Sequence, residues 1–366
     1  MRHLSTVLLL CAATLAASCA TPMRTFDTPV PADRTFEVGA PGGEELARLR
    51  KAAAWSADHE GLALIVLKDD AIVFEDYANG HRLETPVHLF GATRAFGCLM
   101  AAAAVGDGAL DLDAPVYPAL PGWEDDPYKV EITARHLLSL TSGLEQDFRR
   151  LTWDGQRALP RVPDTATLAL SLGADVAAGE GFQYGDAHHV VFAEVLRRKL
   201  GLDPLGWIQK RVFDPIGLHY SGWSRDERGL PHLGFGVWIT AREWARLGVL
   251  LRDDGAFYGR QVLPPGLLAQ CRIGSQAMPA YGLSLWLNTP VTVEQRATLP
   301  PAFGLGEGGP LLYGGAPADL FAAAGHHDQR LYVIPSRGLV IVRLGAGDDD
   351  FRDATFLGIL LDGREP

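Results

Sequence analysis

The stretch His88–Val116 reads HLFGATRAFGCLMAAAAVGDGALDLDAPV, and it has the outline of a helix that opens an active site. An apolar approach leads to a small-residue start at Gly91, and an alanine-rich run then continues to Gly106, where a glycine is well suited to end a helix. The start of this expected helix carries no side chain that could attack a substrate. The sequence therefore raises the question of whether the helix belongs to a working active site.

Strand patterns occur on both sides of this helix, near the two ends of the chain. The run LALIVLKDDAIVFEDYANG, within about 60–80, has two β-rich halves around Lys68-Asp69-Asp70, which is a hairpin pattern. The run RLYVIPSRGLVIVRLG, within about 328–345, has the same form around a Pro-Ser-Arg-Gly turn. The simplest fold pairs these terminal strands in one antiparallel sheet, so we predict an α/β (α+β) class.

The intervening region, about 91–290, is expected to be mostly helical and to cover the sheet. Its helical segments show apolar residues at three- and four-residue spacing with glycine at or near their ends, as in ITARHLLSLTSG, AHHVVFAEVLRRKLG and TAREWARLGVLLRDDG. Further helices are expected at EELARLRKAAAWSA, before the first strand, and at DFRDATFLGILLDG, after the last.

Composition and charge exclude several functions. The 366 residues are 47% hydrophobic and 21% charged, which is ordinary for a globular protein, and the net charge of −11 argues against nucleic-acid binding. No CxxC or HExxH motif suggests a metal. The adjacent His326, His327 and Asp328 cannot easily converge on one ion. We therefore expect no metal and no cofactor.

The N-terminus predicts export. Residues 1–19 combine a short basic start, an apolar run and small residues before Cys19, and LAASC resembles a bacterial lipobox whose cysteine becomes lipidated. Ordinary signal-peptidase cleavage and a plain membrane anchor are the alternatives, although the run is short for a span. We expect a tether over 20–43, a single domain over 44–366, and a location in the periplasm or cell envelope, with membrane contact only through the lipid anchor.

The order of segments resembles the serine β-lactamase and penicillin-binding-protein superfamily, and in particular its class C-related esterases and amide hydrolases. The resemblance runs from about 45 to 361. It is carried by DGALDLDAPVYPALPGW with ITARHLLSLTSGL, FQYGDAHHVVFAEVLRRKLG, FDPIGLHYSGW, ITAREWARLGVLLRDDGAFYGRQVLP, YGLSLWLN and AAGHHDQRLYVIPSRGLVIVRLG. Each motif is weak alone, but six in the family's order imply a β-lactamase/transpeptidase-like fold.

The resemblance implies a catalytic Ser-x-x-Lys at the helix start, and this sequence departs from it. The pattern places Gly91 at the serine position and Arg94 at the lysine position. A glycine cannot form an acyl-enzyme, and a guanidinium stays protonated and cannot serve as the general base that a buried lysine becomes.

Two further family motifs are partly kept. Tyr184 stands at the motif tyrosine, and Asp186 replaces the usual asparagine. In the late turn, Gly-His-x-Gly-Gln reads as Gly-His-His-Asp-Gln, and Asp328 in place of glycine puts the close backbone approach to a substrate in doubt. We therefore predict a ligand-binding set of Gly91, Arg94, Tyr184, Asp186, His326, His327 and Asp328, with no catalytic residue confirmed.

Other nucleophiles have weaker support. The side chain of Thr93 should point away from Gly91, because two helical residues rotate it by about 200°. Ser139 and Ser142 occupy positions that look structural in the family. Cys98 and Cys271 are predicted as small buried apolar side chains in preference to a disulfide, since nothing in the sequence indicates that they meet.

Three functions follow. The favoured one is a non-catalytic relative, in which Arg94 either receives the carboxylate of a small-molecule ligand or pairs internally with Asp186 or Asp328. The second is an ester, amide or β-lactam hydrolase with Tyr184 as base for water and His326 or Arg94 at the oxyanion. The third is an envelope lipoprotein with a structural or partner-binding role.

Overall fold

The computed structural model describes residues 36–146, 151, 164–300, 303 and 308–365. The predicted signal segment, Cys19 and residues 20–35 of the predicted tether lie outside the described residues. Among the described helices, none is both long and apolar enough to cross a membrane.

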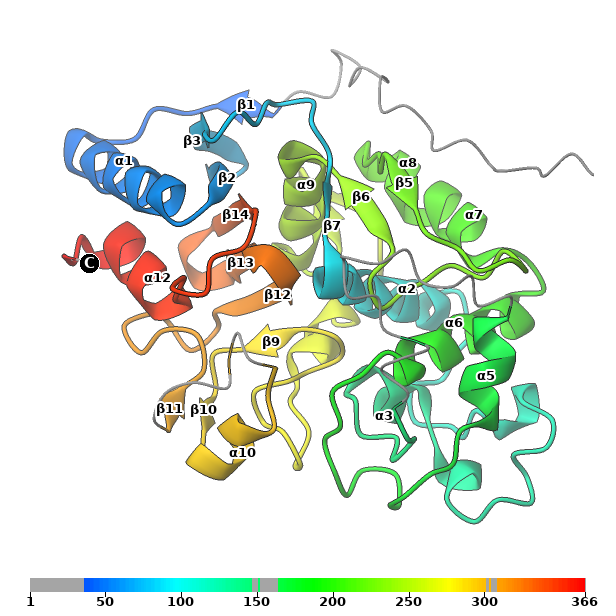
Figure 1. Cartoon of the computed structure of the whole chain (residues 1–366). Coiled ribbons are helices and arrows are strands. Elements are labelled where there is room, and N and C mark those ends of the chain that lie inside the picture. The colour runs from blue at the N-terminus through cyan, green and yellow to red at the C-terminus, as the bar shows by residue number, and fades with distance from the viewer. Residues whose placement is uncertain (1–35, 147–150, 152–163, 301–302, 304–307, 366) are drawn as a thin grey trace, which may run out of the picture.

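A seven-stranded sheet joins the two ends of the chain. Its strands, in spatial order, are β1 (Glu37–Val38), β3 (Ala71–Tyr77), β2 (Gly61–Lys68), β14 (Leu339–Gly345), β13 (Gln329–Ile334), β12 (Phe321–Gly325) and β9 (Trp286–Leu287). Strand β2 pairs directly with β14 in antiparallel register, from Leu339 opposite Lys68 to Leu344 opposite Ala63. Figure 1 shows these blue and red strands side by side. The predicted hairpins and the antiparallel pairing of the terminal strands are confirmed, and only β1 runs parallel to its neighbour β3.

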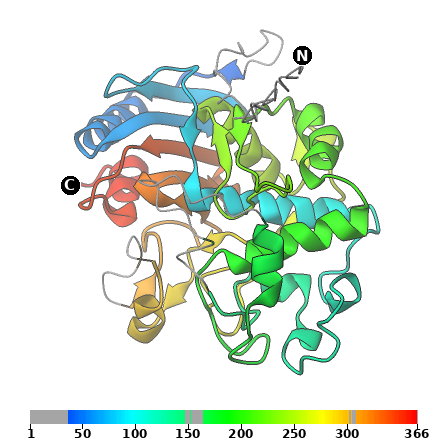
Figure 2. The same ribbon diagram turned by 45° about the vertical axis from the view of Figure 1, so that its right-hand side comes forward.

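Helices cover both faces of the sheet because its central strands are apolar on both sides. Along β2, Ile65 and Leu67 enter one core and Leu64 and Val66 enter the other. Helices α1 (Gly43–Asp58) and α12 (Asp353–Asp362) pack together on the second face. Helix α9 (Ala241–Arg252) packs on the first face, with Trp244 fully buried. Figure 2 shows α9 between the sheet and the helical region.

The region predicted to be helical contains most of the remaining elements. Its helices are η2 (Phe90–Arg94), α2 (Ala95–Gly106), η3 (Tyr117–Ala119), η4 (Lys129–Glu131), α3 (Ala134–Leu138), α5 (Thr165–Ser171), α6 (Ala187–Leu200), α7 (Pro204–Ile208), η5 (Gln209–Phe213), α8 (Asp214–Ile216) and η6 (Leu268–Arg272). Local signals explain the ends of several of them. Thr133 forms a capping box at the start of α3, and Gly201 ends α6 in the left-handed conformation with a φ of 66°.

Short strands also occur there, and the sequence pattern missed them. They are β4 (Val87–His88), β5 (Gly222–Trp223), β6 (Val237–Ile239), β7 (Ala256–Phe257), β8 (Arg260–Gln261) and, at the edge of the main sheet, β9. The remaining elements are β10 (Pro290–Val291), α10 (Val293–Ala297), β11 (Gly309–Pro310), η7 (His326–Asp328) and η8 (Pro335–Arg337). Strands of two or three residues are too short to show the alternation on which strand prediction depends.

The end of the predicted tether is folded. Phe36 is buried, β1 pairs with β3, and α1 begins at Gly43. The prediction of a tether over 20–43 is therefore wrong for residues 36–43, because Phe36 supplies apolar surface, β1 pairs at the edge of the sheet and Gly43 begins α1.

Cys98 and Cys271 form a disulfide, so the prediction of two free thiols is wrong. The two residues are 173 positions apart, and a separation of this size gives no local signal. They meet because η6 packs against α2, which places their Cα atoms 6.0 Å apart, within the normal span of a disulfide.

Candidate functional site

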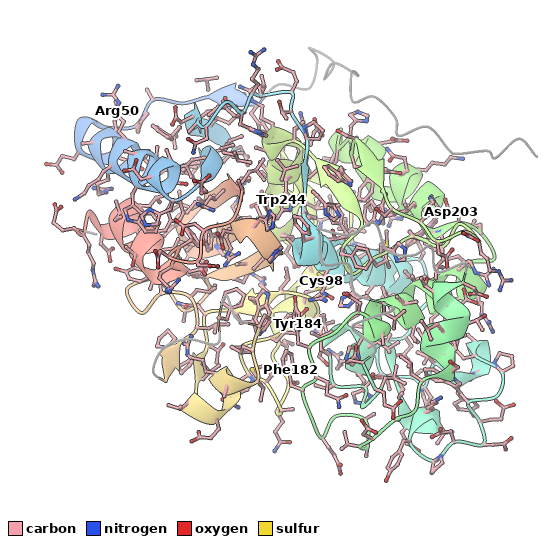
Figure 3. The ribbon with its side chains drawn as sticks, in the orientation of Figure 1. Arg50, Cys98, Phe182, Tyr184, Asp203 and Trp244 are labelled. Carbon is pink, nitrogen blue, oxygen red and sulfur yellow. A yellow bond between two sulfur atoms is a disulfide. The ribbon has the colours of Figure 1, made fainter. Side chains whose placement is uncertain are left out.

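The start of the central helix lies against the end of strand β12. Segment η2 contains Gly91 and Arg94 and leads directly into the buried helix α2. The two elements approach so closely at Gly325 that a Cβ there would lie 2.0 Å from the carbonyl oxygen of Leu89. Only glycine fits at this point, and the contact fixes the position of η2 relative to the sheet. Figure 3 shows the labelled Tyr184 near this centre of the molecule, between the sheet and the helical region.

Three polar groups from different elements surround the position that a side chain at residue 91 would occupy. A Cβ on Gly91 would lie 3.0 Å from Tyr184 Oη, 3.5 Å from the carbonyl oxygen of Ala324 and 3.6 Å from Arg94 Nη1. Gly91 and Tyr184 are partly exposed, so solvent reaches this point. We call Gly91, Arg94, Tyr184, Asp186 and the Ala324 carbonyl the Gly91 site.

Arg94 is paired inside the site. Its Nη2 donates to Asp186 Oδ1 at 2.6 Å, and both residues are almost fully buried, with exposed fractions of 5% and 3%. The prediction that Arg94 pairs with Asp186 or Asp328 is therefore confirmed for Asp186. This is the one hydrogen bond that the Arg94 side chain makes to a described residue, and its Nε is buried with no partner among those residues.

The environment keeps the guanidinium charged. Burial alone would lower the pKa of Arg94, but its interactions with Tyr184, Asp186 and Tyr281 raise the pKa above its usual value, and of these three only Asp186 is a carboxylate. Arg94 also lies over the ring of Tyr184, with Cζ 4.2 Å from the ring centroid, a cation–π contact. A permanently charged guanidinium can bind an acceptor oxygen but cannot take a proton from a nucleophile.

An aromatic wall also contacts Tyr184, and the sequence reasoning did not assign this wall to the site. Trp286 stacks on Tyr184 with ring centroids 6.1 Å apart, and Tyr281 packs edge-on against Trp286 at 4.7 Å. Both residues belong to the YGLSLWLN segment, which carried part of the family resemblance. That motif could have identified them as site residues.

The late turn lies at the rim rather than in the Gly91 site. His326 is exposed and His327 is half-buried, and their rings lie 5.5 and 5.0 Å from the ring of Phe90. Burial and the neighbouring His326 lower the pKa of His327. Asp328 accepts a hydrogen bond from the backbone of Asp348, at 2.9 Å, and is half-buried. No contact between these three residues and Arg94 is present in the described part of the chain.

Other hydroxyl groups are used structurally. Thr93 is buried, and its Oγ1 accepts a hydrogen bond from the Val237 backbone at 3.3 Å, away from the site as expected. Ser142 is fully buried and lies 2.8 Å from Nδ1 of His188. Ser139 is also buried and donates to the Arg135 carbonyl at 2.8 Å. None of the three is positioned to attack a ligand at Gly91.

A hollow of about 460 Å³ lies elsewhere, between α6, α7 and the loop 224–231. It is lined by Arg197, Arg198, Gly201, Leu202, Asp203, Pro204, Arg225, Arg228, Gly229 and Pro231. Its arginines are paired with Glu194, Asp203 and Asp164. Every arginine of the hollow therefore has a carboxylate partner, although Arg197 and Arg198 share Glu194. Within the described residues, no group of three histidine, cysteine or acidic side chains is arranged to hold a metal.

The β-lactamase family model matches residues 46–361. This chain belongs to the β-lactamase family. Similar folds among solved structures include EstCE1, a hydrolase with promiscuous acyltransferase activity (17% identity over 87% of this chain and 97% of that chain, TM-score 0.65). A β-lactamase/D-alanine carboxypeptidase of Pseudomonas syringae (14%, 88% and 100%, 0.63) and a penicillin-binding protein homologue of Caulobacter crescentus (15%, 86% and 94%, 0.62) are also similar. At these identities the likeness establishes the fold and confirms the predicted class, while the family model confirms the predicted family.

Proposed function

We propose that this protein is an exported, non-catalytic member of the β-lactamase family that binds a small carboxylate-bearing ligand at the Gly91 site. The observation that carries the proposal is the convergence of Tyr184 Oη and Arg94 Nη1 on Gly91, a residue without a side chain. The polar groups that would serve a nucleophile are present there, while residue 91 offers no atom that could attack.

The state of Arg94 supports the absence of turnover. A general base must be able to lose its proton near neutral pH, and the surroundings of Arg94 raise its pKa further. The ring of Tyr184 contacts both Arg94 and Trp286, so it has little freedom to take over a different role.

The unused donors of Arg94 support a ligand with acceptor oxygens. A guanidinium carries five N–H groups, and the pair with Asp186 uses one of them at 2.6 Å. Unsatisfied buried donors cost free energy, which a carboxylate oxygen at Gly91 would recover. Asp186 already balances the charge, so we expect weak binding that depends on geometry.

The disulfide supports export. Cys98 and Cys271 are both buried, and structural disulfides of this kind form and persist mainly in oxidising compartments such as the periplasm. This agrees with the signal segment expected over 1–19, which would bring the domain to the cell envelope through lipidation at Cys19.

Catalysis is tested by covalent labelling of the mature protein with a fluorophosphonate probe and a fluorescent penicillin. We expect no labelling of the wild type and labelling of the double variant Gly91→Ser, Arg94→Lys, in which Tyr184 must move by a few tenths of an ångström to admit the new Cβ. The matched control is Gly91→Ala, Arg94→Lys, which has the same packing change without a hydroxyl. Labelling of the wild type would disprove the non-catalytic assignment.

Ligand binding is tested by thermal shift with acetate and propionate against acetamide and propionamide, which have the same shape without the charge. We expect stabilisation by the carboxylates alone, and its loss in Arg94→Met. Equal shifts from the acids and the amides, or a shift that persists in Arg94→Met, would contradict the assignment of Arg94 as the binding group.

A further inference from the structure

The disulfide joins the two sides of the Gly91 site. Cys98 lies on α2, one helical turn after Arg94, and is fully buried. Cys271 lies in η6, at the start of the segment that leads to the aromatic wall of the site. The bond therefore connects α2, which directly follows Arg94 in the chain, with the segment that carries Tyr281 and Trp286.

From Cys271, tight backbone contacts lead to the aromatic wall. The carbonyl oxygen of Cys271 accepts a hydrogen bond from the Leu283 N–H at 3.0 Å. A Cβ on Gly282 would lie 2.0 Å from that same carbonyl oxygen, so the backbone at Gly282 and the backbone at Cys271 are in direct contact. Any movement of Cys271 must consequently move the residues beside Tyr281.

The next residue, Ser284, is anchored to the helical region. It adopts a φ of 66°, a conformation rarely taken by residues other than glycine, and its N–H donates to the Leu138 carbonyl at 2.8 Å. Its Oγ lies 2.9 Å from His189 Nε2, and a Cβ on Gly97 would lie 3.4 Å from the same Oγ. A strained residue persists only where its surroundings hold it, and here they include the turn of α2 next to Cys98.

The contacts return to α2 through the aromatic side chains. Tyr281 packs on Trp286, Trp286 stacks on Tyr184, and Arg94 lies over the ring of Tyr184. The chain of contacts that begins at Cys98 in α2 therefore returns to Arg94, the residue that immediately precedes α2. The disulfide is the covalent link in this chain of contacts, and the other links are hydrogen bonds and packing contacts.

We propose that the Cys98–Cys271 disulfide is a conformational lock on the Gly91 site, so that Tyr184 and Arg94 take up their positions fully only after oxidation. Closure is a thiol–disulfide exchange with a disulfide oxidoreductase. A sulfur–sulfur bond forms between the two cysteines as the acceptor's disulfide breaks, and the acceptor takes up two electrons and two protons as a pair of thiols. In a reducing compartment Cys98 and Cys271 remain free thiols, and the bond does not constrain the site.

The lock is tested by amide hydrogen exchange of the oxidised full-length mature protein, of the same protein refolded under a thiol reductant, and of the double variant Cys98→Ala, Cys271→Ala. We expect exchange in 268–287 and 181–187 to accelerate by about tenfold or more when the bond is open, with α12 unchanged, because local opening is confined to the elements that lose a constraint.

The matched control is Leu360→Ala in α12, a helix that packs mainly against α1, although Leu360 shares its apolar core with Tyr281 and Trp286. It should accelerate exchange in α12 and α1 more than in 268–287, which is the opposite of the order expected when the disulfide is open. If opening the disulfide accelerates exchange uniformly in all described elements, or leaves 268–287 and 181–187 unchanged, the lock is refuted and the bond acts only on global stability. If the double variant does not fold, the comparison of the oxidised and the reduced wild type still decides the test.

The consequence for ligand binding rests on the proposed function. With the disulfide open, the thermal shift produced by acetate should disappear. If acetate produces no shift in either redox state, the proposed carboxylate ligand is wrong, whereas the exchange data still decide the lock. If acetate shifts both states equally, the lock does not govern the site.

Discussion

The buried pair of Arg94 and Asp186 offers the sharpest test of how the site is held together. At 2.6 Å and an effective dielectric constant of 20, Coulomb attraction between the two charges is about 6 kcal/mol before desolvation is counted. Desolvation costs several kcal/mol for each ion, so the net contribution of the pair to folding is close to zero. Removal of one partner should destabilise the fold strongly, because the remaining buried charge is then unpaired.

We therefore predict a strongly non-additive double-mutant cycle. Arg94→Met and Asp186→Ala should each lower the free energy of unfolding by about 3–5 kcal/mol. The double variant should be less destabilised than the sum of the two by at least about 3 kcal/mol, because it buries no unpaired charge. The cycle is measured by urea unfolding followed by far-ultraviolet circular dichroism at one fixed pH.

The salt dependence of the cycle is an internal control. A pair that is 5% and 3% exposed is screened little by added salt, so 0.5 M NaCl should leave the coupling unchanged. Additive single effects, with coupling below about 0.5 kcal/mol, would show that Arg94 and Asp186 are not paired in solution and would refute the reasoning.

Three further predictions follow from the same structure. Asp186→Asn should strengthen acetate binding by about tenfold, because it removes the negative charge that competes for the guanidinium, and isothermal titration calorimetry against the wild type measures this. His188 is buried and neutral, and burial lowers its pKa from 6.5 to about 4. Below pH 6.5 the unfolded state binds a proton at this ring that the folded state does not bind. The free energy of unfolding is therefore highest above pH 6.5 and decreases as the pH falls, by about 2 kcal/mol at pH 5. NMR titration of the ring should give a midpoint near 4. Gly325→Ala should destabilise by more than about 3 kcal/mol in urea unfolding, since the new Cβ would lie 2.0 Å from the Leu89 carbonyl. Gly43→Ala, at the first position of α1 where nothing lies within 4 Å, should change the stability by less than about 0.5 kcal/mol; equal effects would contradict the packing account.

The sequence predicted those parts of the fold that have a local signature. The hairpins around Lys68 and within 328–345 follow from alternating apolar runs and turn residues, and α6 and α9 follow from three- and four-residue spacing. Strand β12, FAAAG, was missed because alanine favours no strand and its pattern does not alternate. The short strands within 91–290 were missed for a different reason, because two or three residues cannot show an alternating pattern.

The site was predicted as a set of residues but not as an arrangement. Family motifs placed Gly91, Arg94 and Tyr184 together, and the structure brings them within contact distance. The choice of Asp186 over Asp328 as partner depends on the direction of side chains in three dimensions. The disulfide depends on contacts between segments 173 residues apart, and neither kind of information is contained in one sequence.

The paired charges also bear on why the site has this form. Well-packed apolar residues in place of a buried ion pair would be as stable or more so, so stability alone does not account for Arg94 and Asp186. A pair of this kind imposes geometry, because each charge tolerates few positions other than beside its partner. Here the geometry places a guanidinium nitrogen 3.6 Å from the vacant Cβ position of Gly91, where a ligand oxygen can reach it. We infer that the pair is kept because it orients Arg94 toward that position, and the disulfide holds the opposite wall in register with it.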